Sequence, residues 1–131
     1  MPAEVPGPVE LRGLRVLVVE DEFLVAMDLE LMLQELGCEV VGPIGDLARA
    51  QRTAAEETFD VALLDVNIGG QPVTTVADAL VARGVPMVFC TGYQAENLPD
   101  RYPAAPTLMK PFQATDIAAA LRRAAAGASA G

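Results

Sequence analysis

Short, continuous apolar runs recur along the chain, separated by longer stretches of mixed polarity. Runs of this length, bounded by glycine and polar residues, are typical of strands buried on both faces of a parallel sheet. The runs that predict strands are Leu14–Val19, Glu39–Gly42, Val61–Asp65, Val85–Cys90 and Thr107–Met109.

The stretches between these runs carry a helical period. From Glu22 to Leu36 the apolar residues follow a broad helical stripe, which Gly37 closes. The residues of that stripe are Phe23, Leu24, Met27, Leu31, Leu33 and Leu36. Asp46 is suited to cap a second helix that runs to about Glu57.

Two further helices complete the alternation. One is expected from about Thr74 to Arg83, stopped by Gly84, and an alanine-rich one from about Thr115 to a point before Gly127. Prolines at three positions limit any helix within residues 94–106 to a short or irregular one. The alternation predicts an α/β fold, a doubly wound five-stranded parallel sheet with helices on both faces.

Length and composition indicate one domain. The chain has 131 residues, and we expect a flexible Pro/Gly-rich arm over residues 1–12, the domain over 13–126 and a tail over 127–131. The net charge of -9 argues against a nucleic-acid partner and against an anionic membrane surface. No leader or apolar segment of about 20 residues occurs, so we expect a cytoplasmic protein without a membrane span.

Residues with phosphate or metal chemistry follow four of the predicted strands. Glu20 and Asp21 follow the first, Asp65 ends the third, Thr91 follows the fourth and Lys110 follows the fifth. The carboxyl ends of parallel strands meet at one edge, so these groups are expected to gather in one cleft. Carboxylates suit Mg²⁺. Because the chain has no histidine, an aspartate is the leading candidate to carry a covalent phosphoryl group.

Each of these residues alone has an ordinary structural explanation. Asp21 is suited to cap the helix after it, and a lone Lys110 or Thr91 would most often be a solvated loop residue. The joint arrangement is more specific, because the acids, Asp65 and Lys110-Pro111 occur in this order at the ends of the first, third and fifth strands.

Over residues 13–126 this arrangement resembles the receiver domain of response regulators in two-component signalling. The resemblance implies a flavodoxin- and CheY-like (βα)5 fold, with Asp65 as phospho-acceptor. It also implies Mg²⁺ or Mn²⁺ bound by Glu20, Asp21, Asp65 and the backbone carbonyl of Asn67.

The same resemblance assigns the remaining residues of the site. Thr91 matches the switch hydroxyl, Lys110 matches the lysine, and the bond before Pro111 is expected to be cis. The run from Phe89 through Gly92 to Tyr93 resembles stand-alone alphaproteobacterial receivers with a Phe-Ala-Thr-Gly-aromatic pattern, with Cys in place of Ala.

One departure concerns the switch aromatic. Receivers usually carry Tyr or Phe shortly before the lysine, but here Thr107 and Leu108 stand there. Tyr93 either takes over as the mobile aromatic or is an exposed loop tyrosine. Both interpretations stay open at the level of sequence.

The resemblance implies a single-domain response regulator that is not an enzyme. A sensor histidine kinase or a histidine phosphotransfer protein would phosphorylate Asp65, and the product would bind a partner or a second receiver. The alternatives are a phosphate sink and a pseudo-receiver that acts without phosphorylation. A haloacid-dehalogenase-type phosphatase needs an aspartate where Asn67 stands, and the Gly-rich phosphate loop of a nucleotide-binding protein is absent.

Overall fold

The computed structural model describes residues 11–92 and 105–130, and for 127–130 only the backbone. Helices and strands alternate along most of this part of the chain. Their order is β1 Arg15–Val19, α1 Phe23–Glu35, β2 Glu39–Ile44, α2 Leu47–Glu56, β3 Val61–Asp65, β4 Asn67–Ile68, β5 Gln71–Pro72, α3 Thr74–Arg83, β6 Met87–Thr91, β7 Thr107–Met109 and α4 Ala114–Ala130.

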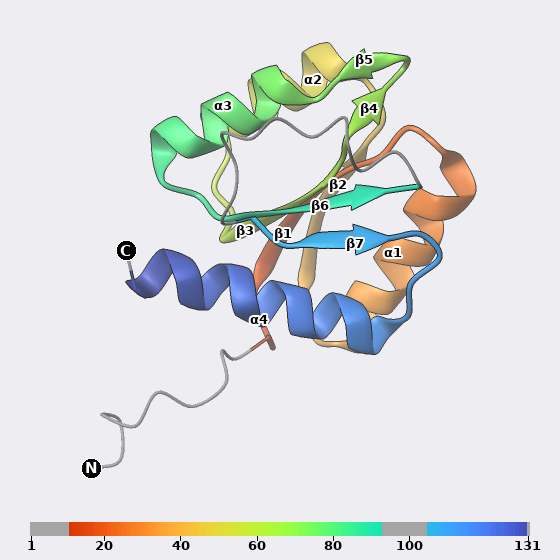
Figure 1. The fold of residues 1–131 in the computed structure, drawn as a ribbon, viewed down its shortest axis with the longest axis vertical. Helices are drawn as coiled ribbons and strands as arrows, with labels where there is room; N and C mark the ends of the chain where they lie inside the picture. The colour runs from red at the N-terminus through yellow and green to blue at the C-terminus, as the bar shows by residue number, and fades with distance from the viewer. Residues whose placement is uncertain (1–10, 93–104, 131) are drawn as a thin grey trace.

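A five-stranded sheet forms the centre of the molecule. Its strand order is β2-β1-β3-β6-β7, and every neighbouring pair is parallel. Helices α2 and α3 cover one face, and α1 and α4 cover the other (Figure 1). The prediction of a doubly wound parallel sheet is therefore confirmed, and the carboxyl ends of all five strands lie along one edge.

Alternate residues of the central strands build two separate cores. In β1, Leu17 and Val19 pack in the cluster beneath α2 and α3, whereas Val16 and Val18 pack with α1 and α4. All four side chains are fully buried. Burial on both faces explains why residues 16–19 of β1 and 61–64 of β3 are continuous apolar runs in the sequence.

Strand β2 is longer than the sequence predicts. The apolar run ends at Gly42, but the strand continues through Pro43 to Ile44, with a shift of register against β1 between Leu17 and Val19. β2 is an edge strand, and an edge tolerates a proline because the missing N–H need not face a neighbouring strand.

Helix α4 and the segment after β3 also differ from expectation. Helix α4 continues past Gly127 to Ala130, because a single glycine costs a helix only about 1 kcal/mol relative to alanine.

After β3 the chain forms a small antiparallel hairpin, β4–β5, that the sequence pattern does not predict. The short helix expected within residues 94–106 falls almost entirely outside the described residues.

Helix α1 buries fewer of its apolar residues than its sequence stripe suggests. The side chains buried beneath it are Ala26, Leu29 and Leu33. Its exposed apolar residues are Phe23 at 72%, Leu24 at 71%, Met27 at 43% and Leu31 at 56% exposure. We refer to these four as the α1 apolar surface. None of the described helices has the length and apolar character needed to cross a membrane.

Candidate functional site

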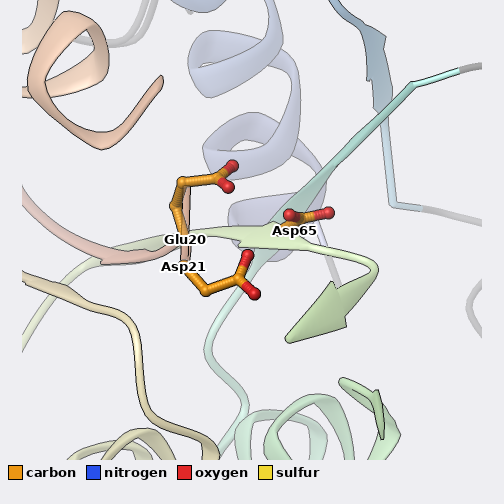
Figure 2. Close-up of side chains that lie close together, drawn as sticks. All are labelled: Glu20, Asp21 and Asp65. Carbon is orange, nitrogen blue, oxygen red and sulfur yellow. The ribbon is translucent and has the colours of Figure 1, made fainter. Parts of the chain in front are cut away.

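Three carboxylates meet where β1 and β3 end. Glu20 and Asp21 directly follow β1, Asp65 is the last residue of β3, and those two strands are direct neighbours in the sheet. One carboxylate oxygen from each residue lies within 4.8 Å of the others. Figure 2 shows the three side chains gathered at this edge.

The main chain fixes Glu20 in a buried position. Its N–H donates to the carbonyl of Ile44 at 2.9 Å, and its Oε2 accepts the N–H of Glu22 at 3.0 Å. Glu22 is the N-cap of α1, so the Glu20 carboxylate satisfies one of the free N–H groups at that helix end. Only 3% of Glu20 is exposed, whereas Asp21 is exposed.

Lys110 contacts two of the three acids. Its Nζ is 3.0 Å from Oε1 of Glu20 and 3.4 Å from Oδ2 of Asp65. The N–H of Lys110 donates to the carbonyl of Thr91 at 2.8 Å, and its bond to Pro111 is cis, as expected. The ammonium group is thereby held beside the acceptor expected from the sequence.

Burial and neighbouring charges shift the pKa values of Glu20 and Lys110. Desolvation raises the pKa of Glu20 to about 7, and the nearby charge of Asp65 adds to the rise. The N–H of Glu22 and the ammonium of Lys110 lower that pKa but do not cancel the effect of burial. Burial alone would lower the pKa of Lys110, but its contacts with Glu20 and Asp65 raise it overall, so the ammonium stays charged at neutral pH.

The acidic group fits a small, hard cation. Oxygens of one octahedral Mg²⁺ site lie up to about 4.2 Å apart, so a small closing movement of the three carboxylates would suffice. Oε1 of Glu20 is buried and has an ion pair with Lys110 but no aligned hydrogen bond among the described residues. A cation would favour the ionised form of this carboxyl. Glu20, Asp21 and Asp65 are therefore suited to hold Mg²⁺ or Mn²⁺.

Thr91 brings a buried hydroxyl to the same edge. It ends β6, is 1% exposed, and its Oγ1 has no hydrogen-bond partner in the part of the chain that the structure describes. A buried hydroxyl without a partner carries a desolvation cost that a ligand oxygen would relieve. Its neighbour Cys90 pairs with Asp65 across the sheet, and burial raises the pKa of that thiol to about 12.

The remaining predicted site residues, Asn67, Gly92 and Tyr93, have fewer described contacts with the three carboxylates. Asn67 begins β4, and its N–H donates to Oδ1 of Asp65 at 3.4 Å; its carbonyl as a metal ligand stays a prediction. Gly92 is exposed just beyond β6. Tyr93 lies outside the described residues, so its role also stays a prediction.

One contact of the site is missed by reasoning from the sequence. The N–H of Gly69, in the turn of the β4–β5 hairpin, donates to Oδ2 of Asp21 at 2.8 Å. The sequence pattern indicates Gly69-Gly70 only as the boundary of the third strand. Two glycines between short extended segments are a recognised hairpin signal, but the two flanking strands here have only two residues each.

Comparison with known proteins decides the family. The family described as "Response regulator receiver domain" matches residues 16–122. The chain belongs to this family. Receiver domains act in two-component phosphorelay signalling, and phosphorylation and magnesium are typical of them.

Two curated relatives are larger proteins. The chain is 33% identical over 111 residues to the transcriptional regulatory protein PdtaR of Mycobacterium tuberculosis, covering 82% of this chain and 54% of PdtaR. It is 33% identical over 113 residues to the phyllosphere-induced regulator PhyR of Methylorubrum extorquens, covering 83% of this chain and 42% of PhyR. The chain thus spans about half the length of these relatives.

Among solved structures, the solution structure of SdrG from Sphingomonas melonis superposes with a TM-score of 0.76 at 38% identity, covering 88% of this chain and 98% of that one. A structure of SdrG described as its BeF3-activated conformation has a TM-score of 0.72 at 39% identity, with 85% and 95% covered. These neighbours agree with the alphaproteobacterial receiver type that the sequence resembles.

Proposed function

We propose that this receiver domain accepts a phosphoryl group on Asp65 and acts as a response regulator in the cytoplasm. The observation that carries the proposal is that the Asp65 carboxylate has both acidic and basic neighbours. Oxygens of Glu20 and Asp21 lie within 4.8 Å of it and are suited to hold a cation, and the Lys110 ammonium is 3.4 Å from Oδ2 of Asp65. An acceptor carboxylate needs both, because the incoming phosphoryl group is strongly anionic.

The chemical step follows from these groups. An ionised oxygen of Asp65 attacks phosphorus, the bond between phosphorus and the donor histidine nitrogen breaks, and the electron pair stays on the imidazole. Lys110 pairs with one phosphoryl oxygen and the Thr91 hydroxyl donates to another. Mg²⁺ held by the three carboxylates and the carbonyl of Asn67 would neutralise charge on the phosphoryl group. The chain acts as an acceptor and not as an enzyme with turnover on an external substrate.

The α1 apolar surface supports a protein donor. Helix α1 begins two residues after Asp21, so Phe23 and Leu24 lie at the edge where Asp65 is placed. A sensor histidine kinase or phosphotransfer protein must bring its phosphohistidine to this edge, and exposed apolar side chains beside the site provide the contact area for docking. We propose that the donor binds there.

Phosphorylation is proposed to shift Thr91 and the chain after it between two states, which alters binding of a partner or of a second receiver. A phosphate sink and a switch differ in the lifetime of the aspartyl phosphate. A lifetime of seconds indicates a sink, and one of many minutes indicates a partner-binding switch.

The acceptor assignment is tested with acetyl phosphate and Mg²⁺. We expect intact-mass spectrometry to find one base-labile phosphoryl group on the wild type and none on Asp65→Asn. Asp60→Asn is the matched control, because Asp60 precedes the same strand at its other end and accepts the N–H of Arg15, which an asparagine oxygen can also do. Equal labelling of wild type and Asp65→Asn would disprove the assignment. No labelling of any variant, by acetyl phosphate or by a kinase, would instead indicate a pseudo-receiver.

A further inference from the structure

Two of the site's carboxylates accept hydrogen bonds from backbone N–H groups of the β4–β5 hairpin. The N–H of Gly69 donates to Oδ2 of Asp21 at 2.8 Å, and the N–H of Asn67 approaches Oδ1 of Asp65 at 3.4 Å. Asp21 and Gly69 are far apart in the sequence, so this contact exists only in the folded chain. The contact to Asp21 is short and charge-assisted, which places it among the stronger hydrogen bonds.

The hairpin is anchored well enough to hold a side chain in place. Ile68 and Val73 are each 2% exposed and belong to the core beneath α2 and α3. The N–H of Val73 donates to the carbonyl of Val66 at 2.9 Å and closes the base of the hairpin. The turn is therefore fixed at both ends to the same core that supports β3.

The turn itself depends on glycine. Gly69 and Gly70 have φ values of 59° and 80°, and two successive positive values are the geometry of a type I′ turn. A Cβ at Gly69 would meet nothing within 4 Å. A side chain there would therefore act through the backbone conformation alone. Asparagine tolerates this left-handed region, whereas a β-branched residue does not.

Asp21 needs such support because, of the three carboxylates suited to hold the cation, it is the exposed one. An exposed aspartate rotates freely, and each rotamer that faces away from Glu20 and Asp65 lowers the share of molecules ready to bind a cation. The hydrogen bond from Gly69 occupies one lone pair of Oδ2 and leaves Oδ1 for the cation. Partners of this kind orient metal ligands in many sites.

We propose that Gly69 is a positioning residue of the cation site, and that the β4–β5 turn sets the affinity for Mg²⁺ by holding the Asp21 carboxylate toward Glu20 and Asp65. This inference rests on the proposed cation site. Because the coupling is reciprocal, cation binding in turn stabilises the turn.

Two substitutions at one position separate the turn from the side chain. We expect Gly69→Val to weaken Mg²⁺ binding about tenfold, the lower end of the effect seen when a partner of a metal ligand is lost. Gly69→Asn, which keeps the N–H and the left-handed backbone, should bind within about twofold of wild type. The probe is Mg²⁺ alone, with affinity measured from backbone amide shifts by NMR and unfolding by urea measured in parallel.

Gly84→Val controls for backbone strain in general. Gly84 ends α3 with φ 72°, and a Cβ added there would also meet nothing within 4 Å, but it precedes β6 and so lies at the other edge of the sheet. An equal loss of Mg²⁺ affinity in Gly84→Val would overturn the proposal. So would an unchanged affinity in Gly69→Val.

Hydrogen exchange of the Gly69 amide tests the contact without any cation. The amide should exchange slowly in metal-free wild type and faster in Asp21→Ala. If the amide exchanges in this way but Gly69→Val still binds Mg²⁺ like wild type, the hydrogen bond exists and does not position the ligand. The positioning role is then wrong and the proposed function stands. If wild type binds no Mg²⁺ at all, the cation assignment fails and the positioning role fails with it.

Discussion

At the scale of single residues, burial decides which side chain at this edge can act as a nucleophile. Cys90 pairs directly with Asp65 across the sheet, yet burial raises its pKa to about 12 and keeps it a thiol. Cys38 is also buried, its pKa is raised by burial, and its Sγ lies 3.5 Å from the carbonyl of Leu11. The nucleophile expected at this edge, the Asp65 carboxylate, is only half-buried and lies beside the Lys110 ammonium.

This difference predicts slow thiol labelling of the folded protein. At pH 8 the thiolate fraction of Cys90 should be roughly a thousandfold below that of a free cysteine, because only the thiolate reacts. We expect an aromatic disulfide reagent to modify both thiols quickly in urea and neither in native buffer. Cys38→Ser assigns the remaining signal to Cys90. Rapid labelling of Cys90 in the folded protein would show that β6 opens readily in solution.

At the scale of elements, α1 shows where sequence periodicity is ambiguous. Its apolar residues cover so much of the helix surface that the pattern does not show which side faces the sheet. Packing selects Ala26, Leu29 and Leu33 for the core and leaves the α1 apolar surface in solvent. The β4–β5 hairpin is ambiguous for the opposite reason, because its strands are too short to show a period.

The α1 apolar surface is testable with a kinase or phosphotransfer donor. Truncating exposed docking residues removes contact area but costs the fold little. Leu24→Ala with Leu31→Ala should slow phosphotransfer from the donor protein about tenfold, in line with interface residues that matter. The reaction with acetyl phosphate should be unchanged. Both rates are measured by phosphate-affinity gel electrophoresis, which separates the phosphorylated from the unphosphorylated protein.

Val81→Ala is the matched control for this surface. Val81 is 55% exposed, but it lies on α3, on the other face of the sheet. If Val81→Ala slows transfer as much as the double variant, the donor does not select α1, and the docking proposal is wrong.

At the scale of the whole molecule, the strand order β2-β1-β3-β6-β7 places β1 and β3 side by side and β7 at the far edge. Lys110 reaches the two acids from beyond β6, 45 residues along the chain from Asp65. The site therefore links the first, third and last strands of the sheet. Any ligand that bridges these groups should stabilise the entire fold, because it binds only the native arrangement.

We accordingly expect Mg²⁺ with beryllofluoride to raise the free energy of unfolding by about 2.7 kcal/mol at a concentration a hundred times Kd. Urea unfolding followed by circular dichroism measures this. Asp65→Asn should lose the increment from beryllofluoride, and EDTA should reverse the effect of Mg²⁺ in wild type. Asp28→Asn, an exposed aspartate on α1, should respond like wild type. A stabilisation that persists in Asp65→Asn would point to binding elsewhere.

The sequence by itself determined the alternation of strands and helices, the parallel sheet and the strand ends at which the site would form. It could do so because strands buried on both faces consist of continuous apolar runs, and because the carboxyl ends of parallel strands lie at the same edge of the sheet. Only the tertiary structure decided the burial of Glu20, the bridging position of Lys110, the exposed side of α1 and the hydrogen bond from Gly69 to Asp21. Each of these depends on distances between residues remote in sequence, and local periodicity carries no information about such distances.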